Sequence, residues 1–191
     1  RDNAHYGIGQ RQFVSNVSKA REVTAADLSK ITDPYTQVSL KLAAAFGLRR
    51  AESIKIQPAW ADRGDRLTLK SSWTKGGRAR EIPIRTEAQR QILQEAKHLA
   101  GRGSLIPAER NYVQQLRRFE HQCTAAGIHR VHGLRHQYAQ TRYRELTGWA
   151  APAAGGPRSG ALTREEKQID HEARLAILDL DIAGLVAFLG G

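Results

Sequence analysis

The sequence has no methionine, a single cysteine and no apolar run long enough to cross a bilayer, which takes about 20 residues. With Cys123 alone, an internal disulfide framework is excluded. The charged start at Arg1 also lacks the apolar stretch of a signal peptide. We therefore expect a cytoplasmic protein with no membrane partner. Because the chain opens on Arg1 and contains no methionine, we also expect a fragment of a longer product.

Acidic residues are scarce relative to basic ones, with 19 Asp and Glu against 30 Lys and Arg, and the net charge is +11 at pH 7. Such an excess raises the local concentration of a polyanion and speeds encounter with it. Nucleic acid is therefore the first partner to test. The length of 191 residues suits one ordinary domain with a sizeable core.

Composition divides the chain into a weakly patterned start and a patterned remainder. Residues 1–32 are polar, with one short helix signal in which Thr24 caps and Asp27 closes the capping box. We interpret them as a linker from a missing upstream domain and residues 33–191 as the domain itself. An insertion at about 148–162, rich in Ala, Pro and Gly, favours a loop.

Apolar residues recur at helical spacing in five stretches of this domain. Val38, Leu42 and Phe46 give the strongest of these stripes, and we expect one helix to carry it between residues 33 and 53. The other helices are expected at residues 86–101, 111–127, 133–146 and 163–177.

One stretch alternates with the period of a strand instead. Leu67, Leu69 and Trp73 alternate with polar residues. Lys75–Gly77 supplies turn chemistry, and Ile82 and Ile84 alternate around Pro83. This pattern predicts a β-hairpin whose first strand includes Trp73 and in which Pro83 lies toward an edge. The fold class is therefore α+β, mainly helical with a small antiparallel β-hairpin or sheet.

Three motifs stand in order along the chain: Phe46–Glu52 with Gly-Leu-Arg and a nearby acid, Trp73–Gly77 with Thr-Lys-Gly, and His132–His136 with His-Gly-Leu-Arg-His. Together they resemble the tyrosine recombinase, or phage integrase, family over roughly residues 36–146. The tail is similar to that of a prophage integrase subgroup, which belongs to mobile elements. The resemblance implies the tyrosine-recombinase catalytic-domain fold for residues 33–191, with residues 1–32 left from an N-terminal DNA-binding domain.

The resemblance also implies roles for particular residues. Arg49 and Arg135 would be the paired arginines on the scissile phosphate, and Glu52 would support the first of them. Lys75 would be the hairpin lysine and His132 the active-site histidine. The partner would be duplex DNA, with a homo-oligomer assembled on it as an option that the sequence leaves open.

These residue types suit the chemistry of a phosphodiester. Cleavage develops negative charge on the non-bridging oxygens, which two guanidinium forks can orient and neutralise. A lysine can protonate the departing 5′ hydroxyl, and a histidine can exchange protons near neutral pH. His132 and Arg135, three apart at a helix start, are expected on one face. Neither a metal nor another cofactor is required.

Each residue also has a purely structural explanation. Arg49 could be a solvated charge at a helix end, Lys75 a surface lysine in a turn, and His132 a donor to backbone at a helix start. His136 and Tyr138 are expected to pack or hydrogen-bond in the core, in support of the site. The order and spacing of the three motifs favour the functional interpretation.

The tail departs from the family. Aligning its closing Phe-Leu-Gly with the subgroup's Tyr-Leu-Gly places Phe188 at the nucleophile and Asp179 at the second histidine. Phenylalanine has no hydroxyl to attack phosphorus, and an aspartate would repel a phosphate. Either the domain is a catalytically silent relative that still binds DNA, or a truncation or frame change altered the tail. Whether the chain is an enzyme therefore stays open.

The sequence thus predicts a site-specific DNA recombination or integration domain, impaired in strand cleavage, in the bacterial cytoplasm at the nucleoid. We expect it to bind duplex DNA without forming a covalent adduct. A catalytically silent DNA-binding or regulatory relative is the first alternative. A generic basic RNA- or ribosome-associated protein is the second, and it would make the three motifs coincidental. The DNA target, the oligomeric state and the upstream domain are not encoded in any pattern that we recognise.

Overall fold

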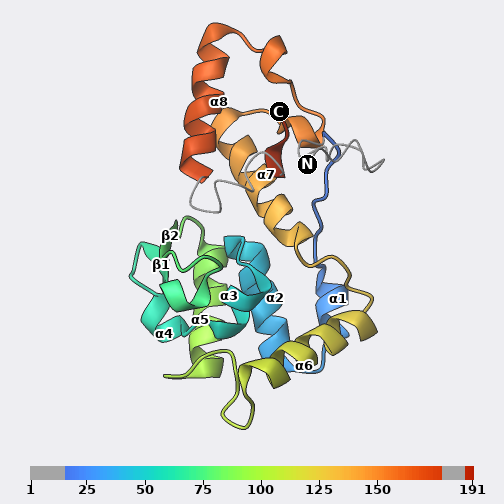
Figure 1. Ribbon diagram of the computed structural model, residues 1–191, viewed down its shortest axis with the longest axis vertical. Coiled ribbons are helices and arrows are strands. Elements are labelled where there is room, and N and C mark those ends of the chain that lie inside the picture. Colours follow the sequence, from blue (N-terminus) through green and yellow to red (C-terminus); the bar gives the residue numbers. More distant parts are fainter. Residues whose placement is uncertain (1–15, 178–187) are drawn as a thin grey trace, which may run out of the picture.

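A computed structural model describes residues 16–177 and 188–191 (Figure 1). Within these residues the chain is mainly helical, with one two-stranded antiparallel sheet, as the sequence predicts. No helix of the described part is both long and apolar enough to span a membrane. The elements are α1 (Ala25–Ser29), α2 (Pro34–Phe46), α3 (Arg50–Lys55), α4 (Pro58–Ala61), β1 (Arg66–Leu69), β2 (Arg80–Pro83), α5 (Glu87–Ala100), α6 (Tyr112–Ala125), α7 (Gly133–Thr147) and α8 (Arg164–Ile177).

Helix α2 is the central element, and α3, α5, α6 and α7 all pack against it. Its residues Val38, Leu42 and Phe46 are buried in a core shared with α5 and the sheet. The single helix expected between residues 33 and 53 is wrong, because the chain turns at Gly47, whose φ of 62° lies in the left-handed region. The turn starts α3 in a new direction, directly after Arg49.

The hairpin also differs from the expectation. Strands β1 and β2 pair from Arg66 opposite Pro83 to Leu69 opposite Arg80, so Trp73 lies outside the sheet. Trp73 instead belongs to a short 3-10 helix, Ser71–Trp73, in which its side chain is buried in the core. Burial of this large apolar ring outweighs continued strand pairing. A wide connection, rather than a tight turn, therefore joins the two strands.

Helix α7 extends from the part that contains α2 to α6 into a second part built around α8 (Figure 1). There Tyr143, Ala173 and Ile177 form a second core that includes Phe188 of the tail. The stretch expected as an open loop at about 148–162 is more ordered, since it contains two single-turn 3-10 helices, Pro152–Ala154 and Ser159–Ala161.

Residues 16–32 pack on the domain, whereas residues 1–15 of the expected linker lie outside the described residues. The backbone N–H of Arg21 donates to the carbonyl of Gly133 at 3.0 Å. This approach requires glycine, because a Cβ at residue 133 would lie 2.7 Å from the carbonyl oxygen of Lys19. The predicted capping box of Thr24 forms at the start of α1, and Ile31 is buried against α2 and α6.

The buried carboxylate of Asp33 fastens α2 to α6. Its Oδ2 accepts hydrogen bonds from the backbone N–H of Thr36 at 2.9 Å and from Gln115 at 3.0 Å. Its Oδ1 accepts one from Arg110 at 3.2 Å. Burial raises the pKa of Asp33, but hydrogen bonds from Thr36, Gln115 and Arg110 outweigh this effect and hold it below the ordinary 3.8.

We predict that Asp33→Ala lowers the free energy of unfolding by about 2–3 kcal/mol, because it removes a helix cap and leaves buried donors without their acceptor. Since the folded-state pKa of Asp33 is depressed, its contribution is complete above pH 3.8 and is lost as the pH falls through the folded-state value. Urea unfolding at neutral and acidic pH measures both effects. A variant as stable as the parent at pH 7 contradicts the prediction.

Candidate functional site

The site is built around the carboxylate of Glu52, which is fully buried in the first turn of α3. Gly47 turns the chain so that Arg49 precedes the helix in an extended conformation. Glu52 then reaches back and accepts the backbone N–H of Arg49 at 2.7 Å. Its other oxygen accepts the Arg49 guanidinium at 2.9 Å. This local geometry orients the Arg49 side chain, which stays 20% exposed.

Two further arginines reach the same carboxylate from distant parts of the sequence. Arg80, at the start of β2, donates to Glu52 at 2.7 Å. Arg135, in the first turn of α7, has its Nη1 3.7 Å from the same Glu52 oxygen and also donates to the carbonyl of Gly47. The side chain of Arg135 is only 1% exposed. Three guanidinium groups from three elements therefore converge on one buried carboxylate.

The start of α7 adds an aromatic cluster beside Arg135. The ring of Phe188 lies 4.6 Å from that of His136 and 5.7 Å from that of His132, measured between centroids. The guanidinium carbon of Arg135 lies 5.5 Å from the centroid of Phe188. His132 is exposed, whereas His136 and Phe188 are buried. The aligned nucleophile position thus adjoins the predicted histidine and arginine.

His136 behaves as a neutral imidazole near pH 7. Burial, together with the positive charges of His132, Lys19 and Arg135, lowers the pKa of His136 from 6.5 to about 4. Among the described residues, its Nδ1 has no hydrogen-bond partner. The prediction that His136 packs in the core is consistent with this burial.

Further contacts hold the end of the tail against α7 and α8. Gln140 donates to the backbone carbonyl of Phe188 at 3.0 Å, and Arg174 donates to that of Gly190 at 3.0 Å. Tyr143 lies in the same core, but its hydroxyl is buried and bonded to Asp170. Burial, together with Asp170, raises the pKa of Tyr143 to about 12, so this hydroxyl is a poor nucleophile.

Two predicted residues are not brought to this cluster. Lys75 is exposed in the connection between the strands, and it forms no hydrogen bond or ion pair within the described part of the chain. Asp179 lies outside the described residues. Arg80 is the residue that the sequence reasoning missed, although it lies two positions before the buried Ile82 and so on the same inward face of β2.

Comparison with family models identifies the family of the chain. The model described as Integrase matches residues 9–141, more than half of the 191 residues. The chain belongs to the Integrase family. This membership supports a role in DNA integration or recombination and implies DNA binding. The match covers Glu52 and its three arginines and ends before Phe188. Neither the curated proteins nor the solved structures give a match.

We predict that acidification destabilises the fold through His136. Between pH 6.5 and about 4 the unfolded chain binds a proton at this residue that the folded chain does not bind. The stability contributed at high pH is therefore lost as the pH falls through this window, by at most about 3 kcal/mol. In His136→Gln this component is absent, so the difference in unfolding free energy between parent and variant should change over the window. A difference that is constant with pH contradicts the prediction.

Proposed function

We propose that residues 33–191 are a tyrosine-recombinase-type integrase domain that binds duplex DNA and holds one backbone phosphate with Arg49, Arg135, His132 and Lys75. In this proposal residues 1–32 are the linker to an N-terminal DNA-binding domain. The observation that carries the proposal is the convergence of Arg49 and Arg135 on the buried Glu52. Integrase family membership supports DNA as the partner.

The electrostatics of the cluster suit a phosphate. Glu52, Arg49, Arg80 and Arg135 are three cations and one anion, so these four groups carry a net charge of +2. Glu52 fixes the guanidinium of Arg49 while 20% of that side chain remains exposed. An arginine held in this way can bind a phosphate oxygen with little loss of side-chain entropy. Exposed His132, on the adjoining turn, supplies a proton donor at the same surface.

Lys75 enters the proposal through the connection between the strands. Arg80, bound to Glu52, anchors the end of this connection where β2 begins. Gly76 and Gly77, both with positive φ, follow Lys75 and make the backbone beside it flexible. We propose that the connection closes over bound DNA and brings the ammonium group to the phosphate held by Arg49.

Phe188 favours the second candidate function, a catalytically silent DNA-binding or regulatory relative. Its ring adjoins Arg135, His132 and His136, where the resemblance to prophage integrases expects a tyrosine. The phenyl ring can pack as a tyrosine ring would, but it lacks the hydroxyl that acts as nucleophile. Binding of DNA is therefore retained in our proposal, and the covalent step is absent.

We predict that Arg49→Ala weakens binding to a fluorescent duplex about tenfold or more, because a charge-assisted contact to phosphate is lost. The slope of log K against log salt should fall in magnitude by about 0.9, the value for one phosphate contact. Arg102→Ala, which removes an equally charged side chain from an exposed turn, is the matched control. Fluorescence anisotropy at several salt concentrations gives both quantities. Equal behaviour of the two variants would reject the phosphate site.

We predict that Phe188→Tyr allows a covalent protein–DNA adduct that the parent chain does not form. The substitution adds a hydroxyl to a ring already packed beside His132, His136 and Arg135. A pool of nicked duplexes of random sequence covers the unknown target, and the nick lets the released fragment leave. Denaturing gels before and after protease treatment detect the adduct. An adduct formed by the parent chain would show that another residue acts as nucleophile.

A further inference from the structure

A hollow of about 460 Å³ adjoins the site on the side of α6. It lies between the start of α3, helix α6 and the linker of residues 126–132 that leads into α7. His132 and Arg135 line it, so it is continuous with the proposed phosphate site. Its other charged or titratable lining residues are Arg50, Glu120, His129, Arg130 and the thiol of Cys123.

The hollow is basic. Its arginines are Arg50, Arg130 and Arg135, and its only acid among the described lining residues is Glu120. Glu120 forms an ion pair with Arg50 at 2.7 Å, in which both side chains are about half exposed. This pair is open to competition, because solvent screens exposed ion pairs and makes them weak. A bound anion can therefore take Arg50 from Glu120 at little cost.

Arg130 stands in an unusual backbone conformation. Its φ of 56° lies in the left-handed region, where glycine is unstrained and arginine is not. Its carbonyl accepts the N–H of Gly133 at 2.7 Å, which closes the turn that positions His132. Its side chain is exposed and forms no ion pair with another described residue. The turn that presents His132 thus also presents a guanidinium to the hollow.

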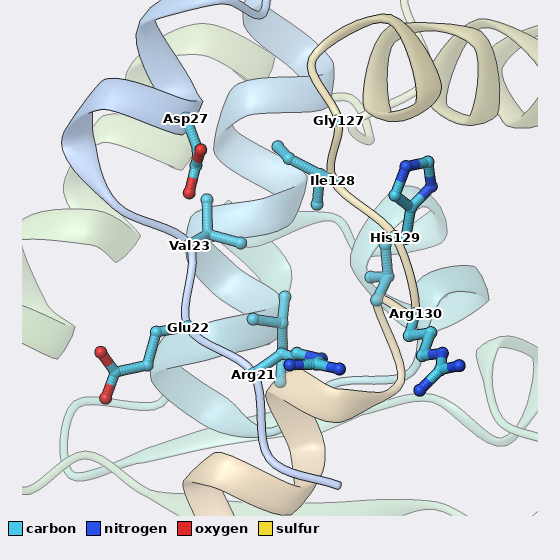
Figure 2. A pocket seen from close by; sticks show the side chains of 10 residues that line it. Arg21, Glu22, Val23, Asp27, Gly127, Ile128, His129 and Arg130 are labelled. Atoms are coloured by element: carbon cyan, nitrogen blue, oxygen red, sulfur yellow. The ribbon is translucent and has the colours of Figure 1, made fainter.

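The linker of residues 126–132 also borders a second hollow. Figure 2 shows His129 and Arg130 leaving the chain away from Val23 and Asp27. This second hollow, of about 640 Å³, has mixed charge, because Glu22 and Asp27 line it together with Arg21, His129 and Arg130. Among the described lining residues, the hollow that adjoins the Glu52 site therefore has fewer acids, Glu120 alone, than this second hollow.

We propose that the hollow is a second phosphate site, in which Arg130, Arg50 and His129 receive the DNA backbone next to the phosphate bound by Arg49 and Arg135. The inference rests on the proposed function for the identity of the first phosphate. A nucleic acid strand carries its charges at regular intervals, so one fixed phosphate places its neighbour within reach of an adjoining basic pocket. Contacts of this kind fix the register of the protein on the duplex and do not read its sequence.

In this site Glu120 competes with a phosphate for the guanidinium of Arg50. While it pairs with Arg50 it occupies the guanidinium that a phosphate would use. Replacement by glutamine removes the negative charge and keeps the shape. Binding of DNA should then become tighter, a direction that damage to the fold would not produce.

The test measures binding of the full chain to a fluorescent duplex of mixed sequence over a range of salt concentrations. Arg130→Gly removes the guanidinium at a backbone position that glycine adopts without strain. We expect it to weaken binding about tenfold and to reduce the magnitude of the salt slope by about 0.9. Arg130→Lys should keep the parent slope, Arg102→Ala should behave as the parent, and Glu120→Gln should bind several-fold more tightly.

The inference is overturned by an Arg130→Gly variant indistinguishable from Arg102→Ala, or by a Glu120→Gln variant that gains no affinity. Arg49→Ala, measured in parallel, separates this result from the proposed function. Weak binding by Arg49→Ala alone preserves the first phosphate site and rejects the second. Weak binding by Arg130→Gly alone shows a phosphate contact in the hollow. It rejects the phosphate site at Arg49, and with it the proposed pairing of the two sites.

Discussion

Burial of the Glu52 carboxylate is the constraint on which the site depends. A carboxylate without solvent is costly by several kcal/mol unless cations and N–H donors surround it. Here Arg49 is supplied by the same helix turn, Arg80 by the sheet and Arg135 by α7. The three elements are therefore held in one arrangement, because moving any of them away would leave the buried carboxylate with fewer cations around it.

Helix α7 carries this arrangement to the second core. Its first turn contributes Arg135 to Glu52, its middle contributes Gln140 to the backbone of Phe188, and Tyr143 packs farther along with α8. Helix α7 therefore contacts both the site and the end of the tail. Within the described residues, Phe188 is held by Gln140 of α7 and by packing against Ala173 and Ile177 of α8.

Local patterns predicted most of the helical structure correctly. The capping box of Thr24 and Asp27 forms as expected, because a cap needs only residues three apart. The same reasoning failed at Gly47 and Trp73. The left-handed turn and the burial of the indole ring depend on what the rest of the chain places nearby.

The site divides along the same line between local and long-range information. Glu52 and Arg49 are three residues apart, so their pairing was predictable from the sequence. The third arginine, Arg80, was not assigned, since its role depends on the register of β2 against β1 and on the approach of both to α3. Lys75 stays a prediction, because an exposed side chain in a wide connection has no neighbour that fixes it.

The geometry separates binding from chemistry at Phe188. The contacts that would hold a phosphate come from Arg49, Arg135 and His132, and none of them needs a hydroxyl at position 188. The phenyl ring meanwhile fills the space beside His136, whose neutral imidazole suits an apolar neighbour. A tyrosine there would need a partner for its hydroxyl in the absence of DNA. In our proposal, loss of the nucleophile therefore leaves the DNA-facing surface intact, so a domain without strand cleavage can still bind and compete for DNA.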